Sequence, residues 1–229
     1  MKIIATVRDG NASYTHSWQQ ARKKNSARIN MTDTDKINES YFGLFMEQFP
    51  SLSLEAKTFT HSILTLKKYN KKEFLFKSGD IQKEIGYVCQ GLLRKYYINE
   101  KGNKITTGFI SEQGYATDYP SFLRQKPTKY YIECLEPSII IDMPYEKLQE
   151  SYRKYKGSEM YGRLIAEQVL TRETDRVESF MFLNAEERYL DFLDQNKDIS
   201  NRISLTHLAS YLGIERQSLS RIRGNLARK

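Results

Sequence analysis

Two short runs of apolar residues near the C-terminal end of the chain recur with helical spacing. The first run lies within residues 205–212 and the second within residues 214–226, and Gly213 separates them. Each run places its leucines and isoleucines on one side, which is the pattern of an amphipathic helix that packs against a core. Because a glycine between the runs permits a sharp turn, the pattern predicts a helix-turn-helix.

The middle of the chain has a different pattern, in which short strand-like runs alternate with glycines. Six glycines fall between residues 79 and 114, and residues 99–103, with the sequence NEKGN, favour a hairpin loop. Many short strands at this spacing predict an antiparallel barrel or sandwich over residues 63–143.

Helical periodicity lies on both sides of the strand region. It predicts helices over residues 31–49, 53–62, 145–155 and from Ser158 onward. The last of these is polar nearly all round over residues 171–179, so it must find a partner or bridge two domains. Asn184, with Glu187 three residues later, forms a plausible capping box for a further helix.

The net charge of +8 is concentrated at the two ends of the chain. Residues 1–30 and residues 201–229 each carry six basic residues against one acidic residue, so the remaining residues sum to −2. A local excess of arginine within a predicted helix-turn-helix is the footprint of a protein that contacts a polyanion. The charge therefore favours nucleic acid as a partner of the C-terminal end.

The second C-terminal helix leaves polar side chains on its outer side, among them Arg216, Gln217, Ser220 and Arg221. Arginine forms paired hydrogen bonds with guanine in the major groove, glutamine does so with adenine, and serine reaches phosphates. The sequence therefore predicts that this helix reads base edges in DNA. Glu215 stands where a capping serine or threonine is usual, so we expect a weakly capped helix start.

Other classes of function lack the residues that they need. No run approaches the roughly 18 apolar residues that span a membrane, and the N-terminal end lacks the apolar stretch of a secretory signal. Cys89 and Cys134 are expected to be reduced core residues. The strand region contains no histidine, which argues against a cupin metal site, and no P-loop, zincin or nucleophile-elbow motif occurs. We expect a cytoplasmic protein that is not an enzyme and holds no metal.

The order of these elements resembles that of the Crp/Fnr family of bacterial transcription regulators. The resemblance covers residues 37–226 and is most specific in EFLFKSGD, GYVCQGLLRKYYINEKGNKITTGFI and ISLTHLASYLGIERQSLSRIR. It implies an α+β fold: an N-terminal antiparallel β-roll of the jelly-roll type, a long dimerisation helix and a C-terminal winged-helix-like helix-turn-helix domain. It further implies a homodimer that binds a pseudo-palindromic operator in double-stranded DNA, with RNA polymerase as a further partner and the roll as sensor of an effector.

On this basis the chain is expected to have four parts. Residues 1–30 are a flexible leader, or an extension upstream of the true start. Residues 31–155 form the cyclic-nucleotide-binding-like roll, residues 156–183 the dimerisation helix and hinge, and residues 184–229 the helix-turn-helix domain.

The resemblance also implies roles for individual residues. It assigns base reading to the four outer residues of the last helix, and the expected phosphate contacts are Ser204, Thr206 and Arg223. The apolar start of the long helix supplies the expected dimer contacts, which are Tyr161, Leu164, Ile165 and Val169.

The effector cassette departs from the family pattern. Residues 114–133 align without gaps, but Thr117 replaces a glycine, Asp118 replaces a glutamate, and Thr128–Lys129 replaces Arg-Ser. The lost arginine removes the fork that matches a cyclic phosphate, and lysine offers only a point charge. Thr174 retains a hydroxyl near the family's adenine contact. We therefore expect a pocket of Asp118, Thr128, Lys129 and Thr174 that takes an unidentified small molecule or none, and that does not bind cyclic AMP as the family does.

Two alternatives stay open at this point. The chain is an effector-independent regulator, or its roll is a ligand-binding or protein-binding module without sequence-specific DNA binding. A steep loss of DNA affinity with rising salt distinguishes phosphate contacts from protein partners.

Overall fold

The computed structural model describes residues 33–228, with side chains from residue 38 onward. The expected leader, residues 1–30, lies outside the described residues. The chain divides between Ser62 and Ile63 into two compact units, called unit 1 and unit 2. The described part of unit 1 contains helices α2 (Asp33–Met46) and α3 (Leu54–Ser62), which confirms the helices predicted there.

Apolar side chains form the core of unit 1. Phe45 is 1% exposed, and its ring centroid lies 5.0 Å from that of Phe49. The His61 ring packs edge-on against Phe42 at 5.4 Å, and its Nε2 lies 3.2 Å from a Glu39 carboxylate oxygen. His61 is therefore held inside unit 1 by neighbouring side chains.

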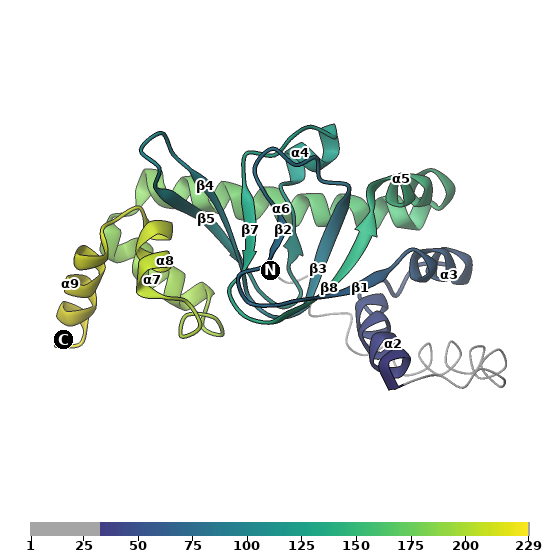
Figure 1. Ribbon diagram of the computed structural model, residues 1–229, viewed down its shortest axis with the longest axis horizontal. Helices are drawn as coiled ribbons and strands as arrows, with labels where there is room; N and C mark the ends of the chain where they lie inside the picture. The colour runs from purple at the N-terminus through teal and green to yellow at the C-terminus, as the bar shows by residue number, and fades with distance from the viewer. Residues whose placement is uncertain (1–32, 229) are drawn as a thin grey trace. The chain divides into compact units, whose positions relative to one another are not determined.

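Unit 2 begins with eight strands in two four-stranded antiparallel sheets, whose orders are β1-β8-β3-β6 and β2-β7-β4-β5 (Figure 1). The strands are β1 (Thr65–Tyr69), β2 (Phe74–Phe76), β3 (Glu84–Gln90), β4 (Leu93–Ile98), β5 (Lys104–Ile110), β6 (Tyr115–Ala116), β7 (Tyr131–Cys134) and β8 (Ser138–Pro144). A short helix, α4 (Tyr119–Arg124), connects β6 to β7. The predicted α+β class with an antiparallel β-roll is confirmed, and two separate sheets replace the closed barrel that was one alternative.

The NEKGN segment forms the predicted hairpin between β4 and β5. The Asn99 amide donates to the Asn103 carbonyl at 3.0 Å, and the Asn99 side-chain oxygen accepts from the amides of Lys101 and Asn103. Gly102 has φ +78°, a conformation in which glycine carries no steric penalty. Local turn chemistry thus fixes the register of β4 on β5.

Fully buried residues from both sheets fill the roll, among them Val88, Leu93, Ile132, Cys134 and Ile140, each 0% exposed. Cys89 and Cys134 are both free thiols; Cys134 lies in the core, as expected, whereas Cys89 is only half-buried. Burial raises the pKa of each thiol, that of Cys134 to about 11, so both are protonated at neutral pH.

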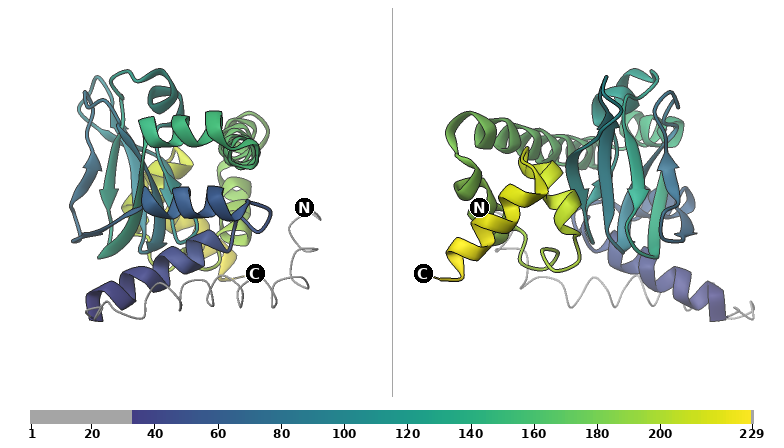
Figure 2. Two further views of the ribbon diagram at one scale, coloured as in Figure 1. Left: turned by 90° about the vertical axis from the view of Figure 1, so that its right-hand side faces the viewer. Right: turned by 60° about the vertical axis from the view of Figure 1, so that its left-hand side comes forward.

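Helices follow the sheets. They are α5 (Tyr145–Lys154), α6 (Lys156–Phe182), α7 (Ala185–Gln195), α8 (Leu205–Leu212) and α9 (Arg216–Leu226). The capping box at α7 is confirmed, because the Asn184 side chain accepts from the Glu187 amide at 3.1 Å and the Glu187 carboxylate accepts from the Asn184 amide at 2.7 Å. No strand follows β8 in residues 145–228, so helices α7 to α9 carry no wing strands. Figure 2 shows α9 projecting away from the sheets.

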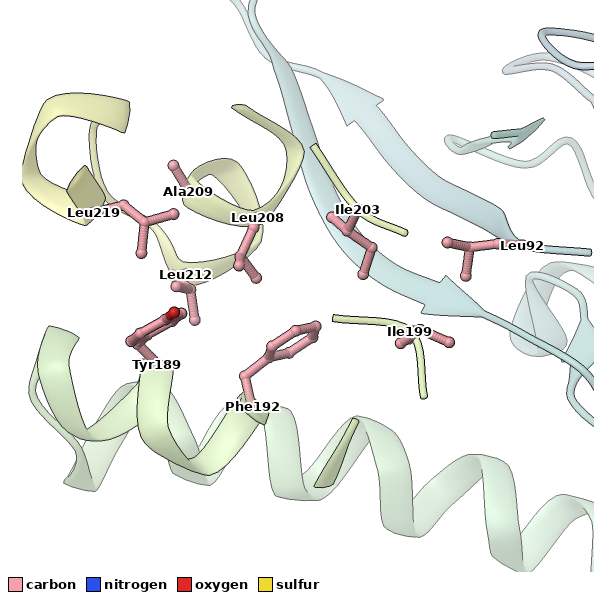
Figure 3. Close-up of a cluster of buried hydrophobic side chains, with 9 residues drawn as sticks. All are labelled: Leu92, Tyr189, Phe192, Ile199, Ile203, Leu208, Ala209, Leu212 and Leu219. Carbon is pink, nitrogen blue, oxygen red and sulfur yellow. The ribbon is translucent and has the colours of Figure 1, made fainter. Parts of the chain in front are cut away.

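One hydrophobic core joins helices α7 and α8 to the roll. Phe192, Ile203, Leu208 and Leu212 pack in a cluster that also contains Leu92, which precedes β4 (Figure 3). The Phe109 ring on β5 lies 6.1 Å from Phe192 and 5.4 Å from Tyr211. The helix-turn-helix therefore packs against the edge of the sheet that contains β5.

Candidate nucleic-acid interface

Helices α8 and α9 form the predicted helix-turn-helix. The Ser204 side chain accepts from the His207 amide at 3.2 Å and so caps the start of α8. Gly213 ends α8 at φ +69°, and the Ile214 amide donates to the Ala209 carbonyl at 3.0 Å. This glycine C-cap is the sharp turn that the sequence requires. Leu219 is 0% exposed and anchors α9 on the core.

The outer face of α9 carries the predicted base-reading residues. Arg216, Gln217, Ser220 and Arg221 are all exposed. Within residues 38–228 neither of these two arginines forms an ion pair, and the Ser220 hydroxyl donates to the Arg216 carbonyl at 3.1 Å. The guanidinium groups are thus available to a partner outside the unit, while Leu219 fixes the opposite face of the helix.

The start of α9 is weakly capped, as expected. Glu215 occupies the N-cap position, and its side chain makes no capping hydrogen bond. The first backbone N–H groups of α9 therefore lack a side-chain partner there, and such groups readily bind a phosphate.

The three expected phosphate contacts differ in their local roles. Ser204 and Thr206 are exposed near the start of α8, and Arg223 is exposed on α9. The Ser204 oxygen already accepts from a backbone amide, but its hydroxyl proton remains available for donation.

The cassette residues Asp118 and Thr128 come together, but they close on each other. The Thr128 hydroxyl donates to Asp118 Oδ2 at 2.7 Å, and the two residues are 4% and 3% exposed. Gln82 Oε1 accepts from the Asp118 amide at 3.1 Å and from the Thr117 hydroxyl at 3.3 Å. Gln82 itself is 5% exposed. This buried network satisfies polar groups that would otherwise be open to a ligand.

The other two cassette residues lie outside this network. Lys129 and Thr174 are exposed, and within the described part of the chain no hydrogen bond joins either of them to Asp118 or Thr128. The sequence analysis did not identify Gln82 as part of the cassette. Its hydrogen-bond partners lie more than 30 residues away, and the residues next to it in the sequence give no sign of them.

The expected dimer residues on α6 are not equally accessible. Leu164 is 39% exposed, whereas Tyr161, Ile165 and Val169 are half-buried within the chain. Farther along α6 the large exposed apolar residues include Leu170, Val177 and Met181, at 67%, 58% and 69%.

Arg202, which precedes α8, makes a second attachment to the roll. Its guanidinium lies 3.0 Å from each carboxylate oxygen of Glu112 and also pairs with Glu136. Burial alone would raise the pKa of Glu112, but hydrogen bonds from Arg202 and from the Gly91 amide lower it to about 2. Nothing in the pattern of charges along the chain indicated that this arginine is used inside the protein.

His207 lies on α8 where that helix faces the roll. Burial, followed by the nearby charges of Arg94 and Lys104, lowers the pKa of His207 to about 4. The imidazole is therefore neutral at physiological pH. In the described residues no cluster of histidine, cysteine and acidic side chains could hold a metal, and no helix is both long and apolar enough to cross a membrane.

Comparisons with known proteins agree with this arrangement. Residues 66–155 match the family model of the cyclic nucleotide-binding domain. Electron transport regulator A of Shewanella oneidensis is 27% identical over 69% of this chain and 67% of its own length.

Two solved structures share the fold. FixK2 from Bradyrhizobium japonicum covers 72% of this chain and 85% of its own, with a TM-score of 0.63 and 15% identity. A transcriptional regulator of the Crp/Fnr family from Thermus thermophilus covers 72% and 86%, with a TM-score of 0.56 and 16% identity.

Proposed function

We propose that the chain is a DNA-binding transcriptional regulator of the Crp/Fnr family, which its cyclic nucleotide-binding domain and its similarity to a curated electron transport regulator favour. In this proposal it binds a pseudo-palindromic operator as a homodimer, and α9 lies in the major groove. The protein is not an enzyme; it works in the cytoplasm and has RNA polymerase as a further partner. The observation that carries the proposal is the exposed face of α9.

That face combines accessible arginine and glutamine with a rigid support. Leu219 is fully buried beneath it, and the turn at Gly213 fixes the direction in which α9 leaves α8. Because the helix is packed, binding to DNA orders these side chains but does not have to order the backbone that carries them. Ser204, Thr206, Arg223 and the uncapped start of α9 supply phosphate contacts.

Selection of bound duplexes from random DNA tests this function. We expect an inverted repeat whose half-sites lie about 34 Å apart, one turn of DNA, and an affinity that falls steeply with salt. Recovery of no repeated sequence, or salt-independent binding, would instead favour a protein-binding module.

We assign dimerisation to α6. In addition to Leu164, the exposed residues Leu170, Val177 and Met181 extend along the helix. Leu170 and Val177 are seven residues apart, which is the spacing of a coiled-coil seam. Tyr161, Ile165 and Val169 flank that seam in the proposal. Sedimentation of wild type and of a Leu170→Glu, Val177→Glu double variant tests this: we expect a dimer and a monomer, and an unchanged dimer excludes the seam.

The closed cassette favours a regulator that needs no cyclic nucleotide. Thr128 stands where the resemblance places the phosphate-binding arginine, and its hydroxyl donates to the buried Asp118 carboxylate instead of facing an open site. Lys129 and Thr174, which stay exposed, are left as the candidate contacts for another small molecule. Calorimetric titration with cyclic AMP and cyclic GMP should show no binding, and a micromolar dissociation constant would contradict the proposal.

A further inference from the structure

The Arg176 guanidinium on α6 contacts two other elements of unit 2. Its Nη2 donates to the Thr106 carbonyl on β5 at 3.1 Å. Nη1 and Nη2 also donate to the Tyr211 carbonyl on α8, at 3.3 and 3.2 Å. The guanidinium lies 4.2 Å from the Tyr211 ring centroid and 5.0 Å from that of Phe180. One side chain thus links the long helix, the sheet and the helix-turn-helix.

The Thr106 carbonyl lies at the edge of a sheet. β5 is the last strand in its sheet, so one side of it has no strand partner. The Ser210 hydroxyl oxygen on α8 accepts from the Thr106 amide at 2.9 Å, and the hydroxyl donates to the Lys104 carbonyl at 3.1 Å. Helix α8 therefore covers this edge and satisfies polar groups that would otherwise need water.

The Tyr211 carbonyl is one of the last four of α8, which have no partner within the helix. A cation at a helix C-terminus also interacts favourably with the helix dipole. Arginine suits this position because its planar fork can serve two carbonyls at once and stack on an aromatic ring, which an ammonium group cannot do.

We propose that Arg176 is a positioning residue for operator binding, which rests on the proposed function. It holds the C-terminal turn of α8 against the edge of β5, and the Gly213 turn then fixes α9. In a dimer joined through α6, this contact sets the distance between the two recognition helices. Arg176 thereby determines which half-site spacing the protein accepts, without touching DNA.

The test compares Arg176→Ala and Arg176→Lys with Arg172→Ala in the full-length protein. Arg172 lies one helical turn away on α6 and is exposed. Its replacement by alanine removes the same charge as Arg176→Ala does. Hydrogen exchange without DNA is measured over residues 104–107 and 205–212. We expect faster exchange there in Arg176→Ala, a smaller effect in Arg176→Lys, and none in Arg172→Ala.

Affinities for duplexes with one or two base pairs inserted between the selected half-sites give the second readout. Wild type and Arg172→Ala should lose about tenfold or more per inserted base pair. Arg176→Ala should bind the original operator about tenfold more weakly, as expected for a lost charged hydrogen bond, and should discriminate less between spacings.

The positioning role is overturned if Arg176→Ala exchanges hydrogen at β5 and α8 as slowly as wild type does. It is also overturned if this variant keeps the wild-type preference for half-site spacing while exchange in the rest of the protein is normal. Faster exchange throughout the roll, including β1 and β8, also overturns it, because Arg176 would then act as a general stabiliser. If wild type selects no inverted repeat, the proposed function fails, while exchange at Thr106 still decides whether Arg176 holds α8 in place.

Discussion

Leu92 and Leu93 offer a matched test of the core shared between the roll and the helix-turn-helix. The two leucines are adjacent, and both are 0% exposed. Leu92 belongs to the cluster that contains Phe192 and Leu208, whereas Leu93 belongs to the cluster inside the roll. Replacing either leucine by alanine removes the same atoms from a fully buried site. Each change should therefore cost about 2–5 kcal/mol of unfolding free energy, through lost transfer energy and the cavity left behind.

The two variants should differ in where they loosen the protein. Segment-resolved hydrogen exchange of Leu92→Ala should show faster exchange in α7 and α8, since a cavity beneath them removes contacts that hold them on the sheet. Leu93→Ala should affect β4 and its partner strands β5 and β7 instead. Urea unfolding measures the total loss. Equal exchange in α7 and α8 for the two variants would refute the shared core.

Three further outcomes follow from single residues. Arg221→Ala should weaken operator binding by about 1–3 kcal/mol and relax specificity at one base pair, measured by fluorescence anisotropy; equal affinity for the selected operator defeats that role. The pKa of about 4 for His207 lies below the unfolded value, so folding favours the neutral ring, and stability should be full above about pH 6.5 and fall by about 1–3 kcal/mol toward pH 4. His207→Gln should remove that part of the pH dependence of urea unfolding, and an unchanged pH profile excludes it. Gly213→Ala places a Cβ 2.7 Å from the Phe180 ring at φ +69° and should cost about 1 kcal/mol or more in thermal unfolding, whereas a neutral change argues against the turn geometry.

Features encoded by local sequence could be predicted well. The turn at Gly213, the Asn184 capping box and the hairpin at residues 99–103 each depend on residues a few positions apart. Their spacing is visible in the sequence because backbone geometry fixes which neighbours meet. The exposure of the α9 face follows in the same way from the burial of its apolar stripe.

Features that depend on docking could not be predicted. Ser210 and Thr106 are 104 residues apart, and Arg202 and Glu112 are 90 apart. The polar second half of α6 indicated that this helix needs a partner, and Arg176 supplies one through the Tyr211 carbonyl. The acceptor of Arg176 is a backbone carbonyl, and the pattern of side chains along a sequence does not indicate which carbonyls accept hydrogen bonds.

The candidate effector pocket shows the same limit. Aligning the cassette identified Asp118 and Thr128, but only the structure shows that the Thr128 hydroxyl satisfies the carboxylate. Gln82 completes that network from another part of the chain. Whether a polar residue faces a ligand or a neighbour depends on tertiary packing, which the residue types alone leave open.

The most direct test of the account measures the ratio of affinities for the selected inverted repeat and for a scrambled duplex of equal length and charge. For wild type at physiological salt we predict a ratio of about 10³ or more. An Arg216→Ala, Arg221→Ala double variant should lose most of this preference while keeping its fold and its dimeric state. A wild-type ratio near one, or a double variant that retains the full preference, would contradict the assignment of α9 as the helix that reads DNA.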